Sequence, residues 1–284
     1  MRHLLVASTT VTLLLVASAS SASAQLLRDQ PVIYGHHHLN VTNLDAQKKF
    51  WVDGLGGVAM KSPSGADFIK FPNVLVFLRA QAPTGPTKGS TVNHIAFSVP
   101  DVRAMVHRLK SRAYRVVTTE EALPGIVVKD DIGQSGEGIA YVLGPDEVKV
   151  ELVQNSKQTM AIAYSHTHFF ATDREAMRNW YAKVFGATPQ AGPNATFITA
   201  TLPGGVLNFT NAPGAVQGTK GRALDHVGFE VKNLEDFCKR VEAQGIKLDV
   251  PYRFVERLHL GVAALTDPWG TYIELNEGLP NFAP

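Results

Sequence analysis

The chain has 284 residues, of which 45% are hydrophobic and 18% charged, and its 27 basic residues nearly balance its 25 acidic residues. This composition is typical of a globular protein and excludes intrinsically disordered, collagen-like and coiled-coil chains. A formal charge of +2 provides no basic stripe for a nucleic acid, and the single cysteine excludes an internal disulfide framework and a cysteine-cluster metal site. The ten histidines need an explanation.

Residues 1–24 differ in composition from the rest of the chain. Arg2 precedes a mostly apolar run, 4–16, and the small residues Ala-Ser-Ala occupy 22–24. We expect a secretory signal peptide that is cleaved after Ala24. An uncleaved membrane anchor is the alternative, but hydroxyl residues interrupt the apolar run, which is short for a span. The mature protein is therefore expected to be exported to the periplasm or secreted, without contact with a membrane after cleavage.

Four similar segments follow in chain order, and each opens with a histidine in a strand pattern. The segment that begins at His36 is repeated 130 residues later at His166, and the segment at His94 is repeated 132 residues later at His226. Apolar residues alternate with these histidines, as in a strand with one buried face. The internal repeat therefore predicts four copies of one structural unit.

Each opening strand is followed by a predicted helix and then by short strands. Polar residues suitable as helix N-caps are Asn43, Asp101, Asp173 and Asn233, and glycines suited to helix ends are Gly56, Gly186 and Gly245. The later strands are expected at 67–70, 74–79, 127–128, 139–143, 148–153, 196–201, 206–210, 262–266 and 271–275. Cys238 lies in a helical apolar pattern, which predicts a buried small hydrophobe rather than a nucleophile.

Loops rich in glycine, proline and threonine separate the units, and residues 155–160 link the two halves of the chain. We therefore predict two homologous domains, 31–156 and 160–279, each built from two units. We expect the two units of one domain to bring their opening strands together on one concave sheet. The fold class is α+β.

Each predicted domain ends with a turn and a strand that carries one glutamate. Glu151 and Glu274 each come six residues after a proline and lie between apolar neighbours. Alternation along the strand turns each glutamate toward the same side as the histidines, where a carboxylate is costly to bury without a cation. We predict one metal triad in each domain: His36, His94 and Glu151 in the first, and His166, His226 and Glu274 in the second.

Two imidazoles and one carboxylate on one face of an octahedron leave positions open for substrate and oxygen on Fe(II). We expect a divalent metal, with Fe(II) first and Mn(II), Ni(II) or Zn(II) as alternatives. The other interpretation is that these side chains are separate core histidines with their own hydrogen-bond partners. Matched spacing of four histidines and two glutamates favours metal binding.

The histidine openings, the helix ends at 50–56 and 180–186, and the Asp-Pro-Trp-Gly ending at 267–274 resemble the vicinal oxygen chelate superfamily. That superfamily includes glyoxalase I, extradiol ring-cleaving dioxygenases and bleomycin-resistance proteins. The resemblance covers nearly the whole mature chain and implies βαβββ modules that pair into a cupped sheet around a metal. Four modules in one chain are similar to the extradiol dioxygenases, whose metal sits in the C-terminal domain at positions matching His166, His226 and Glu274.

Two departures from the family pattern bear on the reaction. Glyoxalase I takes a fourth ligand from the last strand of the other module, where this chain has Phe77 and Asn208. Phenylalanine cannot bind a metal, and asparagine binds weakly through its amide oxygen. The dioxygenases carry a tyrosine ten residues before the C-terminal glutamate, where this chain has Ala264.

Three more histidines are candidate acid/base groups. His38 and His168 lie two residues beyond His36 and His166 on the same strand face, although surface or core filling is an equal interpretation. His259 lies near the position where the dioxygenases carry a catalytic histidine, but it is out of register.

Three functions are compatible with these residues. The first is Fe(II)-dependent, extradiol-dioxygenase-like oxidation of a small substrate with vicinal oxygens. The second is a glyoxalase-like lyase or isomerase, which export away from cytosolic glutathione opposes. The third is a non-catalytic small-molecule-binding protein of the bleomycin-resistance type, which the presence of both triads opposes. We rank them in that order; the sequence leaves open whether the protein is a homo-oligomer.

Overall fold

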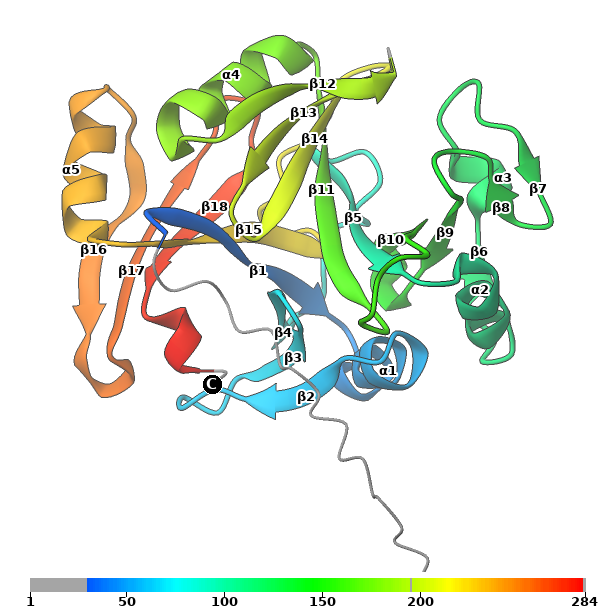
Figure 1. Ribbon diagram of the computed structural model, residues 1–284. Coiled ribbons are helices and arrows are strands. Elements are labelled where there is room, and N and C mark those ends of the chain that lie inside the picture. The colour runs from blue at the N-terminus through cyan, green and yellow to red at the C-terminus, as the bar shows by residue number, and fades with distance from the viewer. Residues whose placement is uncertain (1–29, 195, 283–284) are drawn as a thin grey trace, which may run out of the picture.

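The computed structural model describes residues 30–194 and 196–282 (Figure 1). The predicted signal peptide, 1–24, lies outside the described residues. Within the described ranges the chain forms two large β-sheets with helices around them, which confirms the α+β class. No helix in these ranges has the length and apolar character needed to cross a membrane.

The first half of the chain forms modules 1 and 2. Module 1 comprises β1 (Val32–Val41), α1 (Leu44–Lys48), the π-helical turn η1 (Lys49–Gly54), β2 (Val58–Lys61), β3 (Asp67–Phe71) and β4 (Val74–Ala80). Module 2 comprises β5 (Val92–Val99), α2 (Val102–Lys110), β6 (Arg115–Val116), α3 (Thr118–Glu121), β7 (Val128–Lys129), β8 (Ile132–Gly133), β9 (Ile139–Leu143), η2 (Pro145–Glu147) and β10 (Lys149–Gln154).

The second half forms modules 3 and 4. Module 3 comprises β11 (Ala163–Ala171), α4 (Arg174–Phe185), β12 (Thr188–Asn194), β13 (Phe197–Leu202) and β14 (Gly205–Asn211). Module 4 comprises β15 (Leu224–Val231), α5 (Leu234–Ala243), β16 (Leu248–Val255), η3 (Glu256–Leu258), β17 (Leu260–Thr266) and β18 (Tyr272–Glu277), followed by η4 (Leu279–Asn281).

The two sheets pair modules from opposite halves of the chain. One sheet has the strand order β16-β17-β18-β15-β1-β4-β3-β2 and so joins module 4 to module 1. The other has the order β12-β13-β14-β11-β5-β10-β9-β8-β7 and joins module 3 to module 2. The expectation that the two units within 31–156, or within 160–279, share a sheet was therefore wrong.

The junctions are formed by the opening strands. In every module the opening strand runs parallel to the final strand, and its free edge pairs antiparallel with another opening strand. The pairs are β1 with β15 and β5 with β11 (Figure 1). All four opening strands thus meet a partner in the same way, and the partner always comes from the other half of the chain.

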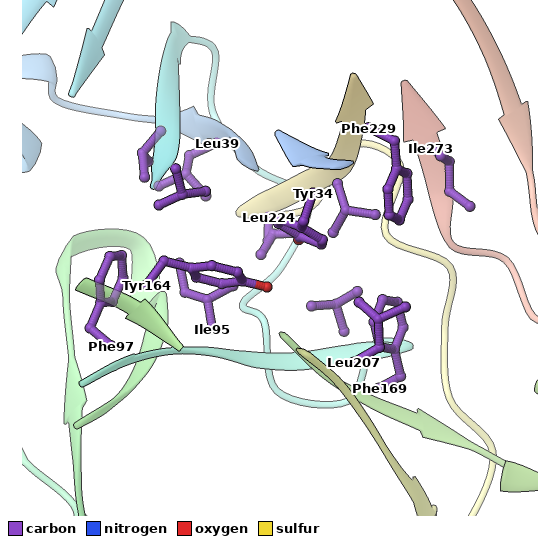
Figure 2. Close-up of a cluster of buried hydrophobic side chains, with 14 of the residues drawn as sticks. Tyr34, Leu39, Ile95, Phe97, Tyr164, Phe169, Leu207, Leu224, Phe229 and Ile273 are labelled. Atoms are coloured by element: carbon purple, nitrogen blue, oxygen red, sulfur yellow. The ribbon is translucent and has the colours of Figure 1, made fainter. Parts of the chain in front are cut away.

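Modules from the same half pack through their apolar faces instead. The rings of Phe71 and Phe97 lie 4.6 Å apart between modules 1 and 2, and those of Phe185 and Phe229 lie 4.4 Å apart between modules 3 and 4. Figure 2 shows side chains from both sheets meeting in this core. Burial of these apolar faces, which is worth about 25 cal/mol per Å², holds the two sheets together.

Local irregularities in the opening strands decide which side chains face the core. A shift in pairing between Tyr34 and His36 places Tyr34 in the core, where its ring stacks on Tyr164 at 4.9 Å. His37 is completely buried next to both tyrosines. The flanking His36 and His38 consequently lie on the opposite, concave face.

Three of the four predicted N-caps are confirmed: the Asn43, Asp101 and Asp173 side chains each accept a backbone N–H of the first helical turn. Asn233 occupies the predicted N-cap position of α5, but its side chain makes no capping hydrogen bond. Its backbone is left-handed with φ 57°, and the Glu277 carboxylate accepts the N–H groups at this helix start. Cys238 is 2% exposed in α5, as predicted.

Candidate metal centres

Two groups of histidine and glutamate side chains lie on the concave faces of the two sheets. In each group, one donor atom per residue lies within 4.8 Å of every other. We call them the His36 site, formed by His36, His226 and Glu274, and the His94 site, formed by His94, Glu151, His166 and His168.

The six predicted ligands are brought together, but not in the predicted combinations. His36 joins His226 and Glu274, whereas His166 joins His94 and Glu151. The cause is the pairing of opening strands, because β1 lies against β15 and β11 lies against β5. Each site therefore takes one histidine from the other half of the chain.

The His36 site centres on the carboxylate of Glu274. Its Oε2 lies 2.7 Å from His226 Nε2 and 3.8 Å from His36 Nε2, while Oε1 accepts a hydrogen bond of 2.9 Å from Asn276. The Nδ1 of His226 lies 2.7 Å from Asp225, which orients the ring. Gly228 lies opposite His36, and a Cβ there would come within 1.9 Å of the imidazole.

The His94 site repeats this arrangement. Glu151 Oε2 lies 2.9 Å from His94 Nε2 and 3.0 Å from His166 Nε2. His94 Nδ1 lies 2.9 Å from the side-chain oxygen of Asn93, the counterpart of Asp225. The residues His94, Glu151 and His166 are at most 8% exposed.

Both donor sets fit a divalent metal. Donors at right angles around an ion with bonds of about 2.1 Å lie about 3.0 Å apart. The nitrogen–oxygen distances are 2.9 and 3.0 Å at the His94 site and 2.7 and 3.8 Å at the His36 site, so the first site matches this spacing more closely. The Nε2 atoms of His226 and His166 are buried and lack a hydrogen bond of acceptable geometry, although a carboxylate is near. A cation between these atoms would satisfy them.

The protonation states also suit a metal. Burial lowers the pKa of His94 to about 4, and the hydrogen bond to Glu151 offsets only part of that effect. Burial acts in the same direction on His226, but the carboxylates of Asp225 and Glu274 outweigh it and raise the pKa, so a metal at the His36 site would have to displace a proton. Burial alone would raise the pKa of Glu151 and Glu274, yet their histidine neighbours hold both well below the usual value. Ionised carboxylates and neutral imidazoles are the forms that bind metals.

The position of a fourth ligand differs between the sites. Phe77 packs its ring 5.3 Å from that of His36, so an apolar group stands there. Asn208 occupies the corresponding place in the His94 site, opposite His168 on the neighbouring strand. Its buried Oδ1 has no hydrogen-bond partner and could reach a ligand in the cup. The His36 site thus offers two histidines and one glutamate. The His94 site offers the same set, with the donor atom of His168 also within 4.8 Å and the Asn208 amide as a weak addition.

Two of the three candidate acid/base histidines lie at the sites. The ring of His38 lies 4.5 Å from that of His226, and the ring of His168 lies 4.7 Å from that of His94. His168 Nε2 is 2.8 Å from the hydroxyl of Thr210. The third, His259, is an exposed residue with φ 47° in the turn before β17 and belongs to neither described cluster.

Sequence reasoning missed Tyr141. This tyrosine pairs with Glu151 across β9 and β10, and its ring lies 5.3 Å from that of His94. It stands ten residues before Glu151. From the sequence we sought a tyrosine at this spacing only before Glu274, where the residue is Ala264. Burial and the Glu151 carboxylate keep the pKa of Tyr141 well above its usual value. The phenol is therefore protonated beside the metal ligands.

A cavity adjoins each site. At the His94 site a cavity of about 650 Å³ is lined by Glu151, His166 and Tyr141 among others. A second cavity of about 430 Å³ beside this site is lined by His94, Lys88 and Lys149 among others. The one at the His36 site has a volume of about 500 Å³ and is lined by His226, Glu274 and several charged side chains. These volumes are in the range of small-molecule binding sites.

Comparison with known families and structures identifies relatives. The model of the Glyoxalase/Bleomycin resistance protein/Dioxygenase superfamily matches residues 33–152 and again residues 163–275. Glyoxalase I from Zea mays superposes with a TM-score of 0.66 and 18% identity over 88% of this chain and 94% of that chain. A putative dioxygenase from Bacillus subtilis gives a TM-score of 0.64 and 14% identity over 91% and 87% of the two chains. At these identities the likeness establishes the fold alone. No curated protein matches the sequence.

Proposed function

Because this chain belongs to the Glyoxalase/Bleomycin resistance protein/Dioxygenase superfamily, we propose that it is a divalent-metal enzyme that oxidises a small substrate with vicinal oxygens. The catalytic centre of the proposal is the His94 site. One observation carries it: two histidines and one glutamate converge there beside a protonated tyrosine. Glyoxalase-type lyase chemistry would take a fourth strong ligand, where this chain has Phe77 and Asn208.

The metal would be held by His94, Glu151 and His166. When bound as Fe(II), it would supply adjacent positions for the two substrate oxygens and for dioxygen. Asn93 holds the His94 ring with Nε2 toward Glu151, so this part of the donor set is preorganised. The cavity beside these ligands is large enough for a single aromatic ring with substituents.

Two side chains of the His94 site are suited to proton transfer. Burial, helped by the nearby His94 and His166, keeps the pKa of His168 well below its usual value, so its imidazole is neutral. A neutral imidazole accepts a proton from a substrate hydroxyl as that hydroxyl approaches the ligands. Tyr141 carries a proton and donates it, or a hydrogen bond, to oxygen on the same side of the sheet. A base and an acid thus flank one cavity.

The experiment measures metal content and oxygen uptake of the mature protein loaded with Fe(II), on a panel of substituted catechols. Tyr141→Phe is expected to keep its metal and lose about 10²- to 10⁴-fold in turnover. Tyr272→Phe, which removes a hydroxyl from the other cup, is the matched control and should be nearly unchanged. Metal binding without oxygen uptake on any catechol of the panel would contradict the proposed oxidation and favour a lyase or isomerase. Absence of bindable metal would leave only a binding protein.

We also propose export, on the leader sequence alone. Cleavage after Ala24 would give a mature chain that begins at Gln25. Mass spectrometry of the protein recovered from a native-like bacterial host tests this: an intact N-terminus on cytosolic protein would contradict it.

A further inference from the structure

Three basic side chains line the cavity of the His36 site and approach it from different elements. Arg79 lies at the end of β4, Arg253 lies on β16, and Lys220 lies in the loop before β15. None of them forms an ion pair with a described acidic side chain; Lys220 lies 4.5 Å from the centre of the Tyr272 ring. The three charges therefore remain available at the mouth of the cavity.

Arg79 lies on the same concave face of the sheet as the candidate metal ligands. It follows Phe77 by two residues on β4, so both side chains lie on the concave face. Arg79 and His38 line the same cavity as His226 and Glu274. The guanidinium is thus within electrostatic reach of the inside of the cup.

The His94 site lacks this feature although it is built on the same plan. Lys88 corresponds to Lys220, since each precedes the residue that orients the site histidine by five positions. Lys88 and the buried Lys149 both form ion pairs with Glu121, which compensates one of the two positive charges. Thr210 stands where the other sheet has Arg79. Among the described residues that line the 650 Å³ cavity, none is a lysine or an arginine.

We propose that the His36 site binds a ligand that carries an anionic group, a carboxylate or a phosphate, and that Arg79, Arg253 and Lys220 hold this group. The His94 site is expected to take a ligand without such a group. The inference rests on the proposed function in one respect, namely that the chain binds a divalent metal, here held by His36, His226 and Glu274 and reached by oxygens of the same ligand. Guanidinium groups suit this task because they donate paired hydrogen bonds to carboxylate and phosphate oxygens.

The formal charges of the residues that line the two cavities favour an anion at one site and not at the other. Three cations and the carboxylates of Asp225 and Glu274 line the His36 cavity, so the lining charge is +1 with neutral histidines and +3 with a divalent ion. Glu151 alone contributes charge to the other cavity, which gives −1 without a metal and +1 with one. Of these two cavities, the His36 cavity therefore keeps a positive charge before a metal binds, and the 650 Å³ cavity does not.

The test measures calorimetric binding of catechol and of 3,4-dihydroxybenzoate to the Fe(II)-loaded full chain without oxygen. The variant Glu151→Gln serves as the background, since it leaves the His36 site as the intact donor set. We expect the benzoate to bind at least about tenfold more tightly than catechol, because hydrogen bonds to charged groups are worth roughly 1.5–3 kcal/mol. The double variant Arg79→Gln/Arg253→Gln should lose this preference, and Lys88→Met, the matched control, should keep it.

A parallel arm uses metal-free protein with benzoate and with inorganic phosphate. Loss of either anion's binding in the double variant supports the anion site even if the protein binds no metal, in which case the proposed function alone fails. The anion that binds more tightly identifies the carboxylate or the phosphate as the group. Equal affinity for catechol and the benzoate, or an unchanged preference in the double variant, would overturn the proposal.

Discussion

The pairing of modules across the two halves makes a sharp prediction about metal stoichiometry. His36 shares a site with Glu274, at 3.8 Å, and not with Glu151. The double variant His36→Ala/Glu274→Gln therefore damages one site and should retain one ion per chain. The double variant His36→Ala/Glu151→Gln damages both sites and should retain none.

The size of the effect follows from the small number of donors. Loss of an outer partner of a metal ligand costs about 10- to 100-fold in affinity, and loss of one ligand from a set of three costs more. We expect each single variant to weaken its own site by more than about 100-fold, which is about 2.7 kcal/mol. The two changes at one site are coupled, because His36 and Glu274 would act on the same ion.

Metal content after dialysis against a weak chelator, measured by atomic emission on protein of known concentration, reports this stoichiometry. Urea denaturation of each variant shows whether the chain still folds cooperatively, since His36 and Glu151 are 1% and 6% exposed. The reasoning is refuted if His36→Ala/Glu151→Gln keeps one ion while His36→Ala/Glu274→Gln keeps none. That result would mean that each half of the chain closes its own site.

Three further predictions concern the described core and its ionisable groups. Burial raises the pKa of Glu230 to about 7, above the ordinary value of 4.5. Between these pH values the native chain holds a proton that the unfolded chain has lost, so stability falls as the pH rises. The free energy of unfolding of Glu230→Gln, relative to that of the parent protein, should therefore be about 1–3 kcal/mol higher at pH 8 than at pH 5, as measured by urea denaturation. Burial raises the pKa of Cys238 to about 11, so a thiol reagent should label it only after unfolding, and Cys238→Ala should cost about 1 kcal/mol. Tyr34→Phe removes a hydroxyl that lies 2.8 Å from the Thr167 hydroxyl and 3.2 Å from His37 Nδ1; the loss should cost about 1–3 kcal/mol in urea denaturation without changing metal content.

The sequence was sufficient for the modules and for the faces of their strands. Alternation around His94 correctly predicted Ile95 and Phe97 in the core and the histidine on the concave side. The glutamates at 151 and 274 were placed correctly for the same reason. These features depend on residues next to each other in the chain, whose side-chain directions the strand geometry fixes.

The partners of the opening strands could not be predicted in this way. All four strands carry the same pattern, so each presents an edge that suits any of the others. The choice depends on long-range packing, such as the stacking of Phe185 on Phe229, which joins modules 3 and 4 through their apolar faces and leaves their strand edges in different sheets. Tyr141 was missed because the tyrosine spacing of the dioxygenases was compared only with the C-terminal Glu274. The same spacing is present before Glu151.

Each triad predicted from the sequence combines residues of one half of the chain, as an isolated half would have to do. Without modules 1 and 2, the strands β11 and β15 would each lose the partner on one edge and expose unpaired backbone groups, a state that promotes pairing with whatever strand is available. Pairing of β11 with β15 would collect His166, His226 and Glu274, the combination inferred from sequence. In the intact chain that combination is prevented because the edges already have partners, and each metal centre consequently depends on both halves being folded. Unfolding of either half would therefore disrupt the donor sets of both sites and release any metal that they hold.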